Sequence, residues 1–427
     1  MLHVLNSVWA LLLGIVLILM GMGMQTTLIS VRGTIENFSP NTLAIIIAAY
    51  FFGYLLGARL APKLIRKVGH VRVFAAMGSI ISASLIAFEI LVSPFAWIII
   101  RFCLGFCMSG VYVTSESWLN NIASNTTRGQ LLSAYMLSQT TGVVLAQGLL
   151  TFGDAQQATL FIVASILVSL SFAPILLSVT PAPSANIIKP MSLFELYKKS
   201  PLGTIGILLL GIVYSAKAGI GAVYAIQAGF SIEQTALFVA IMWIGSLILQ
   251  YPIGWLSDQI DRRTLIAFLA LIGVTASLIG YTSEYMISLL MVAAFFVGGI
   301  ASPLYSMFIA HTNDFLRTDE MASASGGLIF VFGLGAITGP IITGQMMHLI
   351  GPQGFWLMLL IVLISMALYT IWRIISRSAP SLEDAGPYVT ILPISSPVAL
   401  EAVQEWSQEL SEQDGGADEI GDNRHKL

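Results

Sequence analysis

A succession of long apolar runs, separated by short polar stretches, constrains this chain more than any other feature of its sequence. A helix needs about 20 mainly apolar residues to cross a hydrocarbon core roughly 30 Å thick. The chain is 56% hydrophobic and 10% charged, whereas soluble domains carry roughly 25% charged residues. These properties exclude an ordinary soluble enzyme and predict an all-α membrane protein.

The apolar runs predict twelve transmembrane helices. They lie at 8–28, 43–64, 73–92, 95–118, 129–150, 159–179, 203–226, 235–256, 265–282, 286–310, 321–346 and 354–376. A long interruption in the middle of this series holds Pro181, Pro183 and Pro190, followed by two lysines. We therefore predict two pseudo-symmetric six-helix bundles, at 1–180 and 203–377, joined by a cytoplasmic linker at 181–202.

The basic residues predict the orientation, because lysine and arginine in short loops are retained on the cytoplasmic side. With a cytoplasmic N-terminus, the predicted topology places the loop arginines and lysines on that side and only Arg32 on the other. Losing or adding one helix would scatter this set across both faces, which supports an even number of crossings. We expect both termini to be cytoplasmic.

An acidic tail follows the last apolar run, at 378–427. It is rich in proline and glycine and has an acidic stretch from Glu409 to Asp422. Because such a composition cannot bury a core, we expect the tail to be largely disordered. Its short apolar piece, 388–392, is too brief to span a membrane. The alternative for this piece is to pack on the cytoplasmic surface of the protein.

Several loop motifs carry a resemblance to a known family. Residues 254–263 read GWLSDQIDRR, which resembles the major facilitator superfamily signature G-x-L-a-D-r-x-G-r-k but departs from it at Gln259 and Asp261. RFCLG (101–105) is similar to the R-x-x-x-G element of the same superfamily. The YcaD-type branch is similar at SESWLN (115–120), RGQLLSAY (128–135) and AHTND (310–314). The resemblance implies a bacterial cytoplasmic (inner) membrane protein with a central cavity lined by its first, fourth, seventh and tenth helices.

The same resemblance implies a gate at the cytoplasmic face. Asp258 would lie against the N-terminal end of the fifth predicted helix, where unpaired amides and the helix dipole favour an anion. Arg128 would add a charge-assisted hydrogen bond once the two halves close on that side. The alternative to a gate is that Arg262 and Arg263 only set the topology, by keeping their loop on the cytoplasmic side. The predicted inner gate contains Gly254, Asp258, Arg262, Arg263, Glu116, Arg128 and, in the equivalent loop of the first half, Arg66.

Charges at membrane depth point to a substrate cavity, since one at a helix centre costs about 2.5–3.5 kcal/mol even on translocon scales. Lys217 lies about 21 Å into the seventh predicted helix, which leaves open a cavity role or a structural pair with an acidic or carbonyl partner. Arg101, roughly 10 Å from the outer end of its helix, has Glu89 as a possible partner. The predicted cavity residues are Gln25, Arg101, Tyr112, Tyr214, Lys217, Tyr224 and Tyr305.

The sequence contains no phosphate loop, zinc-type histidine cluster or G-x-S-x-G elbow. We therefore expect that the protein is not an enzyme and that it binds no cofactor and no metal. The leading hypothesis is a secondary transporter that moves a small solute by alternating access. Its basic cavity residues favour an anionic or carboxylate-bearing metabolite, with protons left open as the coupling ion. We expect a monomer in the lipid bilayer, with no nucleic-acid partner. Drug or lipid export, and a membrane sensor that signals through its tail, are the alternatives.

Overall fold

The computed structural model describes residues 2–123, 127–176, 191–283 and 286–376, together with 388, 390, 391, 393, 396 and 398–400. Its helices are α1 (Leu2–Ile35), α2 (Pro40–Val68), α3 (His70–Ile90), α4 (Pro94–Ile122), α5 (Arg128–Leu150), α6 (Thr159–Leu176), α7 (Leu193–Lys199), α8 (Pro201–Ser215), the π-helical turn η1 (Ala216–Ile220), α9 (Gly221–Gln227), α10 (Ile232–Ser257), α11 (Arg262–Thr282), α12 (Ile287–Asn313), α13 (Thr318–Ile350) and α14 (Gly354–Ser376). Within the described residues each of the twelve predicted ranges overlaps a helix, with ends that differ by a few residues, whereas α7 and η1 were not predicted. Residues 177–179 of the sixth range lie outside the described residues.

The helices make the chain a multi-pass membrane protein. Within the described residues, ten helical stretches are long and apolar enough to cross a membrane, and α8, η1 and α9 together form one of them. The less apolar α5 and the shorter α6 both pack against α1. Helices suit this environment because every backbone polar group finds its partner within the segment, where no water is available.

The two halves repeat one packing pattern. We call α1–α6 the first bundle and α8–α14, with η1, the second. In the first bundle α2 packs on α4, α1 on α5 and α3 on α6; in the second α10 packs on α12, α8 on α13 and α11 on α14. Glycines permit these close crossings: a Cβ on Gly105 would overlap the carbonyl oxygen of Tyr50, and one on Gly298 would overlap Met242.

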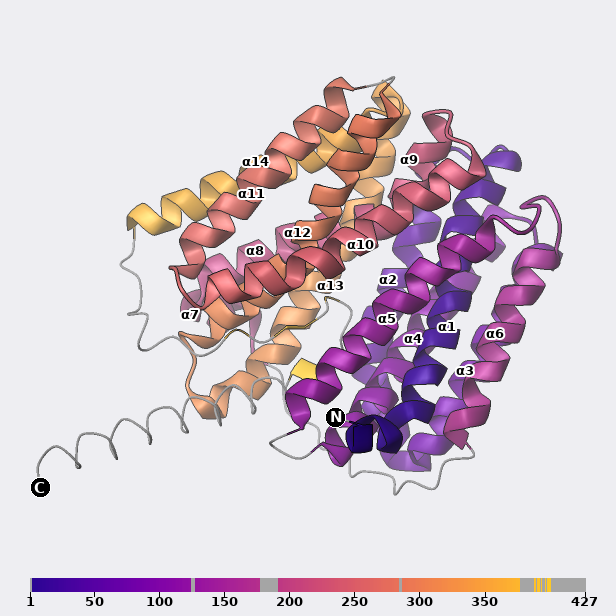
Figure 1. Cartoon of the computed structure of the whole chain (residues 1–427), viewed down its shortest axis with the longest axis horizontal. Helices are drawn as coiled ribbons and strands as arrows, with labels where there is room; N and C mark the ends of the chain where they lie inside the picture. The colour runs from indigo at the N-terminus through magenta and orange to yellow at the C-terminus, as the bar shows by residue number, and fades with distance from the viewer. Residues whose placement is uncertain are drawn as a thin grey trace, which may run out of the picture.

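The bundles meet at one end and splay apart at the other. We call the end where α1 begins the basic face, because α2 ends there with Arg66 and Lys67 and α11 begins there with two arginines. At the opposite face, Gly344 of α13 packs directly against Ala44 of α2. The bundles accordingly converge near α9 and diverge toward the end that carries the N-terminus (Figure 1).

The predicted linker and tail are described only in part. Residues 181–190 lie outside the described residues, while α7 packs along α13, where Lys199 forms an ion pair with Glu320 at 2.9 Å. Most of the tail for which we expect disorder also lies outside the described residues. Its described members between 388 and 400 pack between the bundles, with Ile391 3% and Leu400 0% exposed.

Candidate functional site

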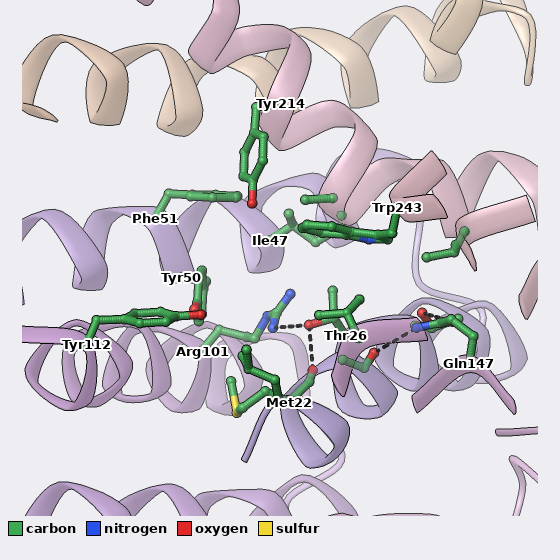
Figure 2. A pocket seen from close by; sticks show the side chains of 17 residues that line it. Met22, Thr26, Ile47, Tyr50, Phe51, Arg101, Tyr112, Gln147, Tyr214 and Trp243 are labelled. Atoms are coloured by element: carbon green, nitrogen blue, oxygen red, sulfur yellow. Dashed lines mark hydrogen bonds between the residues drawn. The ribbon is translucent and has the colours of Figure 1, made fainter. Parts of the chain in front are cut away.

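A cavity of about 90 Å³ lies between the two bundles. The first bundle lines it with side chains from α1, α2, α4 and α5, and the second with side chains from α8, η1 and α10. Figure 2 shows Arg101 and Tyr50 on one side and Tyr214 and Trp243 on the other. A mainly apolar wall with a few polar groups is typical of small-molecule sites.

Arg101 is the charged group of this cavity. Ser93 caps α4 and Pro94 takes its first position, which fixes where the helix begins and sets Arg101 about two turns into it. The side chain is 2% exposed. Its Nη1 donates to Gln25 Oε1 at 3.0 Å and lies 3.5 Å from Thr26 Oγ1, and its guanidinium lies 5.2 Å from the ring centre of Tyr50. These partners are neutral, so they leave the positive charge uncompensated.

Glu89 does not pair with Arg101. Its carboxylate instead lies 3.2 Å from Nη1 of Arg32, and Nε of the same arginine lies 2.8 Å from Glu36 Oε1. Arg32 and Glu89 occupy the last turns of α1 and α3 at the face opposite the basic face, whereas Arg101 lies two turns deeper. Glu89, predicted as a possible partner of Arg101, therefore pairs with Arg32, which lies nearer to it.

Lys217 lies behind the cavity wall. Its Nζ donates to Ser246 Oγ at 2.8 Å and to the carbonyl oxygen of Gly298 at 3.1 Å, and it lies 4.5 Å from the ring centre of Trp243. The side chain is 1% exposed, and Trp243 and Tyr214 line the cavity in front of it. These contacts match the structural alternative with a carbonyl partner.

The π-helical turn η1 explains why Tyr214 and Tyr224, both predicted to line the cavity, do not face it together. A regular α-helix advances roughly 100° per residue, so the extra residue in a π turn rotates everything after it by about that amount. Tyr214, before the turn, lines the cavity. Tyr224, after it, stacks on Phe355 with ring centres 5.0 Å apart, away from the lining residues.

The remaining predicted cavity residues divide between the wall and its surroundings. Tyr112 lines the cavity, and Gln25 supports it through Arg101. Tyr305 is fully buried against Phe332, with ring centres 5.3 Å apart, and is not part of the wall.

Three aromatic lining residues were missed by the sequence analysis: Tyr50, Phe51 and Trp243. Aromatic side chains are common in apolar helices, so their presence alone gave no signal. The crossing of α2 with α4 is what brings Tyr50 beside Arg101, and the meeting of the bundles is what places Trp243 opposite.

At the basic face, part of the tail lies at the predicted gate. We call its described residues between 388 and 400 the C-terminal segment. Asp258 Oδ1 accepts a hydrogen bond from the backbone N–H of Tyr388 at 2.8 Å. Gly254, one turn earlier on α10, faces the same ring: a Cβ there would lie 2.7 Å from Tyr388 Cε1. The expected contact of Asp258 with the start of α5 requires the bundles to close on this face, and here they diverge.

The two arginines of the signature loop form separate ion pairs. Arg262 Nη1 lies 2.8 Å from Asp314 Oδ1, and Arg263 Nη2 lies 2.9 Å from Asp261 Oδ2. Asp261, which stands where the family has glycine, also caps α11 by accepting from the backbone N–H of Arg263. Desolvation raises the pKa of Asp261, but the hydrogen bonds from Arg263 outweigh it and lower the pKa below its ordinary value. This pair therefore adds stability above the ordinary pKa and loses it as pH falls.

We expect Arg262→Gln to lower the free energy of unfolding by about 3–5 kcal/mol, because it removes the cation from an ion pair in which both side chains are only 6% exposed. Arg263→Gln is the matched control: its partner Asp261 is 33% exposed, so the loss should be about 1 kcal/mol or less. Equilibrium unfolding in mixed micelles measures both. Equal losses in the two variants would contradict this assignment.

The other predicted gate residues are spread over the basic face. Glu116, 2% exposed, accepts from the hydroxyl of Tyr135 at 3.2 Å and from the backbone N–H of Ser396 at 2.8 Å. Arg128 lines a small pocket together with Glu116. Arg66 is exposed at the end of α2.

The two helical bundles, which repeat one packing pattern and enclose a mainly apolar cavity, have a fold that solved structures share. The nucleoside transporter NupG superposes with a TM-score of 0.70 at 14% identity, covering 86% of this chain and 98% of that one. A bacterial homolog to the human lysosomal transporter Spinster, in an inward-facing and unoccupied conformation, gives 0.67 at 13% identity, covering 95% and 98%.

Sequence comparison identifies the family. The Major Facilitator Superfamily model matches residues 11–246 and 219–399. The uncharacterized MFS-type transporter YcaD of Escherichia fergusonii is 23% identical over 345 residues, which cover 80% of this chain and 89% of that protein. An uncharacterized MFS-type transporter of Yersinia pestis is 24% identical over 349 residues, with the same coverage. The chain belongs to the Major Facilitator Superfamily, and it is a membrane transporter rather than an enzyme.

Proposed function

We propose that this chain is a secondary active transporter of a small amphipathic anion, a carboxylate attached to an apolar or aromatic group. The observation that carries the proposal is the buried guanidinium of Arg101 at the cavity wall. Among the described residues, no carboxylate lies within ion-pair distance of it. A bound anion would supply the missing charge and would accept from the guanidinium in the fork geometry that carboxylates fit.

The rest of the wall supports an apolar portion in the substrate. Facing Arg101 across the cavity are Trp243, Phe51 and Ile47, which offer flat and branched apolar surface. Lys217 adds positive potential from behind Trp243, but its Nζ is already bonded to Ser246 and Gly298. The carboxylate would therefore bind at Arg101, and the apolar group would pack against Trp243 of the second bundle and against Phe51 and Ile47 of α2.

We further propose twelve crossings with both termini in the cytoplasm, and an inward-facing conformation in a bacterial cytoplasmic membrane. The basic helix ends gathered on one face support the orientation. The contact of Gly344 with Ala44 at the opposite face supports closure on the outside. Alternating access would then proceed by rocking the two bundles about the cavity between them.

A thermal-shift comparison of carboxylates with their amides tests the anion. Each pair of ligands has the same apolar group, so a difference in stabilisation reports the charge. A carboxylate at 100 times its dissociation constant should stabilise the purified full-length protein by about 2.7 kcal/mol, and its amide should produce a much smaller shift. Amides that stabilise as strongly as their carboxylates, or a panel without any stabilising anion, would overturn the proposal.

A further inference from the structure

The C-terminal segment, in its described residues from Tyr388 to Leu400, binds along α10 of the second bundle. At Tyr388 the hydroxyl accepts from Gln250 Nε2 at 2.6 Å, and the backbone N–H donates to Asp258 at 2.8 Å. The ring lies over Gly254, where the missing side chain leaves room for it. Three successive turns of α10 thus hold one residue of the segment.

The segment then contacts α12. The backbone N–H of Ile391 donates to Ser306 Oγ at 3.0 Å, and the same hydroxyl lies 3.0 Å from the carbonyl oxygen of Ile391. Both backbone groups of Ile391 are therefore matched by a single buried side chain. Ile391 itself is 3% exposed.

Its far end reaches the first bundle. The backbone N–H of Ser396 donates to Glu116 Oε2 at 2.8 Å, and Ala399 lines a pocket with Leu131 and Leu132 of α5. Leu400 is 0% exposed. Figure 1 shows this short yellow stretch at the lower end of α5, where the bundles diverge.

We propose that the opening between the bundles at the basic face is a binding site for the chain's own C-terminal segment, which acts there as an autoinhibitory wedge. Asp258 and Gln250 hold it in the second bundle and Glu116 holds it in the first. While it is in place, the bundles cannot close on this face, so the opposite face stays shut. The proposal rests on the alternating-access function proposed above.

The match between the segment and the site is specific in charge as well as shape. The bundles present two carboxylates, Asp258 and Glu116, and the segment meets each with a backbone N–H rather than with a cation. A carboxylate that accepts backbone hydrogen bonds is satisfied without bringing another charge into the interface. Release of the segment would free both carboxylates for contacts within the closing face.

Labelling of a cysteine at the opposite face tests the wedge without any solute. In a background with Cys103 and Cys107 replaced by serine, Ala44→Cys lies where α2 meets α13 and is fully buried. Leu400→Asp would expel the segment by placing a charge at a fully buried position, and Ser396→Pro would remove the N–H that binds Glu116. Either change should speed labelling by a membrane-impermeant maleimide about tenfold or more.

Two controls separate release of the wedge from general loosening. Leu400→Met keeps an apolar side chain of similar volume and should leave the labelling rate unchanged. Phe152→Cys, at a position 87% exposed on the same face as Ala44, should react equally fast in every background. Unchanged Ala44→Cys rates in both release variants would overturn the wedge. Faster rates together with no stabilising anion would uphold the wedge and overturn the proposed substrate.

Discussion

Arg101→Gln is expected to weaken binding of the transported anion by about 10- to 100-fold. The variant removes a charged hydrogen-bond donor worth about 1.5–3 kcal/mol, and each 1.4 kcal/mol corresponds to a factor of ten in affinity. Glutamine keeps polar atoms near Gln25 and Thr26, so the wall retains its hydrogen-bonding character. Ligand-dependent thermal shifts, using the carboxylate that stabilises the parent protein most, measure the change.

Stability without ligand distinguishes binding from a structural role for this arginine. Because the charge of Arg101 is buried among neutral partners, its removal should leave the melting temperature of the ligand-free protein unchanged or raise it. Arg32→Gln is the matched control, since it removes a guanidinium that is ion-paired near the end of α1 and should leave anion affinity unchanged. A lower melting temperature for Arg101→Gln, with anion affinity retained, would assign the residue to the fold.

The helices could be predicted from the sequence because long apolar runs favour helices in a membrane. The ends shifted where polar residues extend a helix beyond its apolar run, as at the start of α13, which begins at Thr318 rather than 321. The short α7 could not be predicted in the same way. Its seven residues lie on the bundle surface and bury mainly Leu196, so they carry no apolar run.

Sequence analysis could predict site residues that are charged and stand in an apolar run. It could not predict which of them face the cavity, because that depends on how the helices turn and pack. Arg101 was identified in this way, and the structure places it at the cavity wall. Lys217 gave the same signal, yet the π turn and the carbonyl of Gly298 hold it behind Trp243. A sequence period cannot show a π turn, because the extra residue is set by packing against neighbouring helices.

The role of the tail was hidden by its composition. Its acidic, proline-rich character predicts a segment without a core of its own. Residues such as Tyr388 and Leu400 need no such core, since they complete an interface that the two bundles leave open. Only the apolar piece at 388–392 pointed to packing, and without the fold it had no defined partner.

Gly105→Ala is expected to destabilise the protein by about 3 kcal/mol, the upper end of the range for an overpacked site. The added Cβ would overlap the carbonyl oxygen of Tyr50 and lie 2.9 Å from the backbone N of Tyr54, so α2 and α4 would have to move apart. Backbone atoms cannot rotate away as a side chain can. Gly148→Ala, where a Cβ meets nothing within 4 Å, is the matched control and should be neutral or stabilising by about 0.5–1 kcal/mol.

The same substitution should also weaken anion binding in the protein that still folds. Gly105 lies one helical turn after Arg101 on α4, and the helix it contacts carries Tyr50, whose ring lies 5.2 Å from the guanidinium. Separating α2 from α4 therefore displaces the cation from its aromatic neighbour. Thermal unfolding, with and without the stabilising carboxylate, measures both effects. Equal stability and equal anion affinity in the Gly105 and Gly148 variants would show that this crossing tolerates a larger separation than its geometry indicates.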